Sequence, residues 1–168
     1  MNALRTYLDY NSTTPLSPPA REAMLEVMNY TGNASSVHWE GRWAKRVIET
    51  AREQIAESLD ASDAQIVFTS GATEANNIIV NSFQNIIASK IEHESIINNS
   101  NITEVEVTSQ GYVDLNNLNE IAKKFKNKKN CIISIMLANN ETGIIQPIDK
   151  ICKIAKNNNI LLHTDAVQ

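Results

Sequence analysis

The run Cys131-Ile132-Ile133-Ser134-Ile135-Met136-Leu137 decides the fold, because it is apolar almost throughout and shows no alternation of polar and apolar residues. A strand buried on both faces has this pattern, and such strands are typical of parallel sheets that helices cover on both sides. We therefore expect the run to form a central strand of an α/β protein.

Outward from this run, other short apolar runs alternate with stretches of helical periodicity. Helices are predicted after the cap Ser17-Pro18-Pro19, over the four-residue apolar repeat from Trp43 to Leu59, and around residues 115–125 and 148–155. Such alternation favours a mostly parallel sheet with flanking helices, in one domain over residues 1–168. The predicted strands are Ile66–Phe68, Ile86–Ala88, Val105–Val107, Ile132–Leu137 and Ile160–Leu162.

The composition narrows the class of function. A net charge of -4, from 19 acidic and 15 basic residues, offers no broad basic surface for nucleic acid or anionic lipid, so a small-molecule partner is favoured. No apolar stretch is long enough for a bilayer span or a secretory signal, and we expect a cytoplasmic protein. Cys131 and Cys152 lack metal-ligand or redox spacing, which predicts no metal site and two small buried apolar side chains.

Polar residues follow the predicted strands. Thr69-Ser70-Gly71-Ala72-Thr73-Glu74 places a glycine turn and the start of a helix directly after a strand, where free amide groups can bind phosphate. Ser and Gly also serve as ordinary cap and turn residues at such positions, so both interpretations stay open. A single histidine in a loop, here His93, is likewise more often an ordinary polar residue.

Two further polar segments belong to the same edge of the predicted sheet. They are residues 139–143, after the central strand, and residues 163–168, after the last strand. Ligands of parallel sheets gather at the carboxyl ends of the strands. Asp165 is the most informative residue, because a carboxylate at the end of an apolar strand is costly unless a cation or a hydrogen-bond donor pairs with it.

Together these segments resemble the NifS/IscS-like cysteine desulfurases of the class V aminotransferase group. The resemblance implies the large domain of a fold type I enzyme that uses pyridoxal 5′-phosphate, with an N-terminal extended segment and helix. The matching segments are Tyr7-Leu8-Asp9-Tyr10-Asn11-Ser12-Thr13-Thr14-Pro15, Gly32-Asn33-Ala34-Ser35-Ser36-Val37-His38, Ser70-Gly71-Ala72-Thr73-Glu74-Ala75-Asn76-Asn77, Glu92-His93, Asn139-Asn140-Glu141-Thr142-Gly143 and His163-Thr164-Asp165-Ala166-Val167-Gln168.

The resemblance also implies roles for six residues. Ala72 and Thr73 would bind the cofactor phosphate. His93 would stack on the pyridine ring and act in catalysis. The ring nitrogen would pair with Asp165, which keeps it protonated and strengthens the ring as an electron sink. The ring hydroxyl or the substrate would bind Asn140 and Gln168.

In this family the Schiff-base lysine lies shortly beyond the position of Gln168, and the nucleophilic cysteine and the substrate-binding arginine lie further on. We expect the chain to represent the N-terminal half, without the C-terminal part and small domain, and to release no sulfur from L-cysteine by itself. The partners implied are L-cysteine, a C-terminal half or a second copy. The alternatives are a non-catalytic remnant, one half of a split enzyme, or another class V aminotransferase or selenocysteine lyase.

The known strand order of the family adds one expectation about the sheet. Its last two strands lie between the first strand and the others, so four adjacent strands should remain here. The strand Ile66–Phe68 would then have no neighbour with which to pair.

Overall fold

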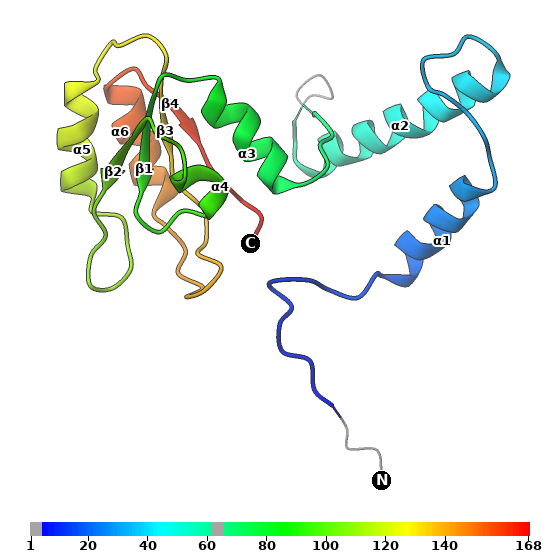
Figure 1. The fold of residues 1–168 in the computed structure, drawn as a ribbon, viewed down its shortest axis with the longest axis horizontal. Coiled ribbons are helices and arrows are strands. Elements are labelled where there is room, and N and C mark those ends of the chain that lie inside the picture. Colours follow the sequence, from blue (N-terminus) through cyan, green and yellow to red (C-terminus); the bar gives the residue numbers. More distant parts are fainter. Residues whose placement is uncertain (1–4, 62–65) are drawn as a thin grey trace. The chain divides into compact units, whose positions relative to one another are not determined.

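The computed structural model describes residues 5–61 and 66–168. The chain divides into two compact units, Met1–Phe68 and Thr69–Gln168 (Figure 1).

The first unit contains two helices, as the sequence predicts. Helix α1 (Pro18–Met28) begins after Ser17, whose Oγ accepts a hydrogen bond from the Ala20 amide. Proline suits the first turn, where a helix has no use for its backbone N–H. Helix α2 (Trp39–Ser58) contains the predicted four-residue repeat. No helix in the described part of the chain is long and apolar enough to cross a membrane.

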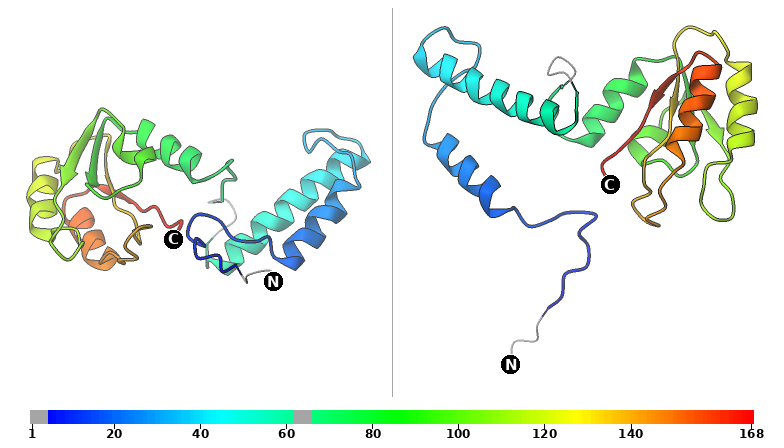
Figure 2. Two further views of the ribbon diagram at one scale, coloured as in Figure 1. Left: turned by 60° about the horizontal axis from the view of Figure 1, so that its bottom comes forward. Right: turned by 180° about the vertical axis from the view of Figure 1, so that it is seen from behind.

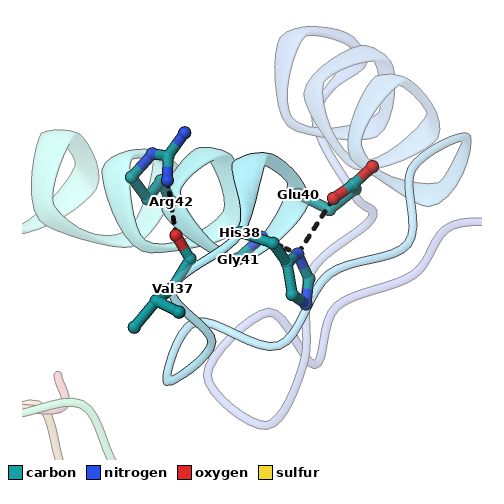
Figure 3. A network of polar contacts seen from close by, with 5 residues as sticks. All are labelled: Val37, His38, Glu40, Gly41 and Arg42. Carbon is teal, nitrogen blue, oxygen red and sulfur yellow. Dashed lines mark hydrogen bonds and ion pairs between the residues drawn. The ribbon is translucent and has the colours of Figure 1, made fainter.

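Helix α2 begins at a polar cap that Figure 3 shows. The His38 Nδ1 accepts a hydrogen bond of 3.3 Å from the Gly41 amide and lies 2.9 Å from the Glu40 carboxylate. The Arg42 guanidinium donates to the Val37 carbonyl and holds the preceding loop against the first turn. Side-chain capping replaces a helical bond that the first amides of any helix lack, so it sets the start of α2.

The second unit contains a four-stranded sheet in the order β2-β1-β3-β4, with every neighbouring pair parallel. The strands are β1 (Asn85–Ser89), β2 (Ile102–Val105), β3 (Cys131–Ser134) and β4 (Leu161–His163). In β3, Ile133 pairs with Ile87 on one side and with Leu162 on the other. The predicted parallel sheet, its four adjacent strands and its central strand are therefore confirmed.

Helices cover both faces of this sheet, as Figures 1 and 2 show. On one face α5 (Leu115–Lys124) and α6 (Ile148–Asn157) bury a core with Ile87 and Ile133. On the other face α3 (Ala72–Asn81) and α4 (Glu94–Ile97) enclose a core with Ile86, Ala88 and Ile132. Adjacent residues of one strand thus enter opposite cores, which explains why β3 is apolar without alternation.

The predicted strand Ile66–Phe68 is wrong, because these residues have no strand structure. The Val67 side chain is 76% exposed and Phe68 is 48% exposed. Arg52 of α2 donates to the Ile66 carbonyl and stacks over the Phe68 ring. A single apolar run needs a neighbouring strand to satisfy its backbone groups, and no strand among residues 5–61 and 66–168 pairs with it.

The bounds of all four strands differ from the prediction, and β1 is longer by one residue at each end. Strand β2 covers Ile102–Val105 instead of Val105–Val107, β4 is shifted by one residue, and β3 ends at Ser134 instead of Leu137. Beyond β3 the Leu137 amide bonds the Asp165 carbonyl at 2.8 Å. The Met136 amide donates a hydrogen bond to the Glu92 carboxyl instead of to a neighbouring strand. The apolar run therefore continues beyond β3 into the segments at the carboxyl edge of the sheet.

Both cysteines are free thiols. Cys131 opens β3 and is buried, and burial raises its pKa. Cys152 lies half-buried on α6. The prediction of a buried apolar side chain is therefore confirmed for Cys131, whereas Cys152 is only half-buried.

Candidate functional site

The polar residues of the second unit gather where β1, β3 and β4 end. Because these strands are parallel, the segments that follow them leave the same edge of the sheet. The three segments carry His93, Asn140 and Asp165. Helix α3, which covers the face next to this edge, contributes a fourth side chain, Asn76.

Asp165 follows β4 and is held by neutral donors. Its Oδ2 accepts a hydrogen bond of 2.8 Å from the Asn76 side-chain amide, and its Oδ1 accepts one of 3.1 Å from the Val167 amide. Within the described residues it takes part in none of the ion pairs. The carboxylate is therefore oriented by the fold, while its charge is left without a cationic side chain.

Asn76 connects Asp165 to His93. It is only 3% exposed, and the second hydrogen of its amide is donated to the Ser95 Oγ at 3.0 Å. That Oγ lies 2.9 Å from the His93 Nδ1, which also accepts the Ser95 amide at 3.1 Å. Since Nδ1 accepts, the proton of a neutral His93 ring lies on Nε2. We call Asp165, Asn76, Ser95 and His93 the polar relay.

The beginning of α3 leaves room for an anion. Gly71 precedes the helix without a side-chain cap, and a Cβ at this position would meet no atom within 4 Å. Glu74 instead bonds the Ser70 amide and hydroxyl, which lower the pKa of its carboxyl. The amides of Ala72 and Thr73 belong to the first turn, where α-helical geometry provides them with no partner. Phosphate suits such a helix end.

Thr73 and Asn76 lie on one face of α3, because residues three apart in a helix are neighbours. One turn of helix, roughly 5 Å, separates them along the axis. Since Asn76 contacts Asp165, the first turn of α3 and the Asp165 carboxylate belong to the same part of the molecule.

His93 and Asn140 line a cavity of about 490 Å³ between the segment after β1 and the loop after β3. The loop is shaped by buried Asn139, whose Oδ1 accepts the amides of Glu141 and Thr142 at 3.1 and 2.8 Å. The Asn139 amide donates to the Ile91 carbonyl at 3.2 Å and fixes the two walls to each other.

His163 lies deeper, at the end of β4. Its Nδ1 is 2.9 Å from the Ser134 hydroxyl. Burial lowers the pKa of His163, and the Asp165 charge opposes this shift. Both influences act on a half-buried ring whose one printed contact is with Ser134.

The structure thus links His93 to Asp165 and places Asn140 beside His93. Ala72 and Thr73 begin α3, and Gln168 lies exposed at the end of the segment after β4. The roles of these six residues remain predictions. Asn76 and Ser95 were missed as site residues. The position of Asn76 one turn after Thr73 was the available signal, whereas Ser95 gave none because α4 is only four residues long.

The described residues include no cluster of three or more histidine, cysteine or acidic side chains that could hold a metal ion. The polar groups at this edge are instead amides, an imidazole and a carboxylate that has no cationic partner among the described residues. This set fits an organic cofactor with an anionic group and a protonated ring nitrogen.

The parallel sheet, its helices and this edge match the N-terminal portion of fold type I enzymes that use pyridoxal 5′-phosphate. Residues 6–168 match the aminotransferase class-V family, and the chain belongs to this family.

Its relatives include the cysteine desulfurase IscS of Dictyoglomus turgidum. That protein is 41% identical over 179 residues, an alignment covering 96% of this chain and 44% of the relative. An IscS-like cysteine desulfurase of Mycobacterium tuberculosis is 34% identical, and the alignment covers 96% of this chain and 46% of that relative. The structure of a NifS-like protein from Rickettsia africae has a TM-score of 0.89 at 41% identity. The match covers 95% of this chain and 47% of the Rickettsia africae chain. The chain therefore spans about half the length of these relatives.

Proposed function

We propose that this chain provides the phosphate-binding and ring-binding half of the cofactor site of a cysteine desulfurase. One observation carries the proposal: buried Asn76 bonds the Asp165 carboxylate from α3, the helix whose first turn is Ala72 and Thr73. A carboxylate for a ring nitrogen and amides for a phosphate are thereby joined within one packed unit. Both units belong, in this proposal, to one incomplete cofactor-binding domain.

In the proposed site, pyridoxal 5′-phosphate supplies an electron sink for carbanion chemistry at the substrate. The Asp165 carboxylate would hold the proton on the ring nitrogen. It is suited to this role because Asn76 and the Val167 amide fix its direction without neutralising its charge.

His93 would cover one face of the ring. Its Nδ1 is engaged by Ser95, so the imidazole is oriented and its Nε2–H remains to donate a hydrogen bond at the reacting side. Asn140, on the wall of the same cavity, would bind the ring hydroxyl or the substrate, together with Gln168.

The covalent steps belong, in this proposal, to residues that the longer relatives carry beyond the matched portion. Removal of sulfur from L-cysteine would then require those residues in addition to the 168 described by this sequence. Pyridoxal 5′-phosphate reacts with any accessible lysine, so binding is best measured with 4′-deoxypyridoxine 5′-phosphate, which has no aldehyde.

Titration of the 168-residue chain with this analogue tests the cofactor site. We expect Asp165→Asn to weaken binding at least about tenfold, since one charge-assisted interaction contributes about 1.5–3 kcal/mol. The matched control is Asp149→Asn, an exposed carboxylate of α6 that should leave the affinity unchanged. Absence of binding by the parent chain, or equal affinity of Asp165→Asn, would contradict the proposal.

The activity is tested by complementation. The chain with pyridoxal 5′-phosphate and L-cysteine should release no sulfide, and borohydride should trap no adduct at one dedicated lysine. Mixing with the unmatched C-terminal portion of the Dictyoglomus turgidum relative should restore sulfide release. Sulfide release by the chain alone would refute the division of roles.

A further inference from the structure

Glu92 is a buried carboxyl group to which the proposed function gives no task. It directly precedes His93 in the segment after β1 and is only 5% exposed. Its Oε1 accepts hydrogen bonds from the Ser89 hydroxyl and from the Met136 amide, the latter at 3.0 Å. Its Oε2 has no hydrogen-bond partner in the described part of the chain.

This arrangement suits a neutral carboxylic acid. Both donors converge on Oε1, as on a carbonyl oxygen with two lone pairs, so Oε2 is the protonated oxygen. A carboxylate would keep a charge on a buried oxygen without a donor, which is unfavourable. Burial is the main cause that raises the pKa of Glu92 to about 7; the hydrogen bonds from Ser89 and Met136 oppose this shift, and the nearby Asp165 charge supports it.

The charged groups around Glu92 do not compensate a negative charge. Lys90 is paired with Glu106 at 2.6 Å. Asp165, after β4, is itself negative, and His163 on β4 bonds Ser134 with a pKa lowered by burial. The neighbours His93 and Glu94 are exposed.

The contacts of Glu92 bear on the position of His93. The Met136 amide lies just beyond β3, so the Glu92 side chain joins the end of β1 to the end of β3. One residue earlier, the Ile91 carbonyl accepts the Asn139 amide from the same loop. These two bonds hold the segment immediately before His93, while Ser95 and Asn76 hold the residues after it.

We propose that Glu92 is a positioning residue, which as a neutral carboxylic acid fastens the segment carrying His93 to the end of β3. Its importance for cofactor binding rests on the proposed function. The tie itself concerns only residues of this chain and can be tested without cofactor.

The sign of the pH dependence follows from the raised pKa. Below about pH 4.5 the Glu92 carboxyl is protonated in both the folded and the unfolded chain, so folding does not have to bury a charge. Between about 4.5 and 7 the unfolded chain loses this proton while the folded chain keeps it, and stability falls as pH rises. Above about 7 the folded group also ionises and the loss levels off.

The experiment compares the parent chain with Glu92→Gln by urea unfolding at pH values from 4.5 to 8. A glutamine oxygen can accept both bonds at every pH. Relative to Glu92→Gln, the unfolding constant of the parent should therefore increase by about a hundredfold between pH 4.5 and 7. His163 contributes equally to both proteins and cancels. Glu120→Gln, an exposed site on α5, should follow the parent.

Two further measurements separate positioning from general stability. In ¹³C spectra the Glu92 carboxyl should titrate near pH 7, apart from the exposed carboxyls. Glu92→Leu leaves the Ser89 and Met136 donors unpaired and should weaken binding of the aldehyde-free analogue at least about fivefold, whereas Glu92→Gln should preserve it.

The inference is overturned if the stability difference between parent and Glu92→Gln is the same at every pH, or if Glu92 titrates near 4.5. Equal analogue binding by folded Glu92→Leu and Glu92→Gln overturns the link to the site. If Glu92→Leu does not fold, the parent and Glu92→Gln still decide the question. Failure of the parent chain to bind the analogue would count against the proposed function alone and would leave the pH comparison valid.

Discussion

The two units of this chain differ in how they use apolar residues. In Thr69–Gln168, β3 is buried throughout and contributes to a core on each face of the sheet. In the first unit α1 has no buried residue, and α2 buries only Gly41 and Ala56. Apolar side chains of both helices, among them Met24, Leu25 and Ile48, are exposed.

The difference shows that an apolar helical pattern alone does not make a core. Helix α2 has a regular four-residue apolar repeat, yet within its own unit it buries only Gly41 and Ala56, whereas α5 and α6 pack on the sheet of theirs. Burial of apolar surface is the main source of stability, so the second unit should provide most of the folding free energy. It also carries the candidate site.

Hydrogen exchange should show the largest contrast between the units. Amides of β1 and β3 exchange only when the core opens, whereas those of α1 need only local fraying. We expect protection factors at least about a thousandfold higher in the two strands, equivalent to about 4 kcal/mol. Equal protection of α1 measured by NMR would show that the first unit is as stably folded as the second.

Truncation of a core residue should have the next largest effect. Ile133 is 0% exposed, and Ile133→Ala should reduce the free energy of unfolding by about 3 kcal/mol because it leaves a cavity between β3 and the helices. The matched change Ile48→Ala, at a side chain 40% exposed on α2, should cost about 0.5 kcal/mol or less. Urea unfolding measures both, and equal losses would contradict the comparison.

The polar relay should be sensitive to Asn76. Asn76→Leu keeps the approximate size of the side chain but removes both donors, leaving the Asp165 and Ser95 oxygens without them. We expect a loss of about 2 kcal/mol in unfolding free energy. Asn77→Leu, at the adjacent half-buried position, should cost less than half as much. If the two variants lose the same stability, the relay does not stabilise the edge of the sheet.

His163 should give the smallest effect, seen as a slope with pH. Burial lowers its folded pKa below the usual 6.5, so the unfolded chain binds the extra proton and stability falls as pH drops through this range. Relative to His163→Gln, in which Glu92 contributes equally and cancels, the parent should lose stability as pH falls from 6.5 to 5. Thermal unfolding of the parent and of His163→Gln at pH values between 6.5 and 5 measures this difference. An unchanged slope in His163→Gln would contradict the assignment.

Particular residues show where prediction from sequence succeeded. The uninterrupted run at Cys131–Leu137 identified the central strand, because only a strand covered on both faces needs apolar residues at every position. Ser17 with two prolines located the start of α1. The run Ile66–Phe68 misled the prediction, since strand formation depends on a partner that local sequence does not specify.

The candidate site divides in the same manner. The resemblance of its motifs to the family implies roles for Ala72, Thr73, His93, Asn140, Asp165 and Gln168, and these roles stay predictions. The sequence did not predict that Asn76 connects these segments by a hydrogen bond to Asp165. Asn76 and Asp165 are 89 positions apart, and their contact arises only when α3 packs beside the end of β4.

By itself the sequence determined the class of fold, the central strand and the family, since these depend on periodicity and on motifs local in the chain. The tertiary structure alone decided which apolar runs become strands, which polar groups meet, and that Glu92 is buried beside Asp165 without a cation. Pairing, burial and electrostatic environment are properties of segments brought together from distant positions, and no local pattern fixes them.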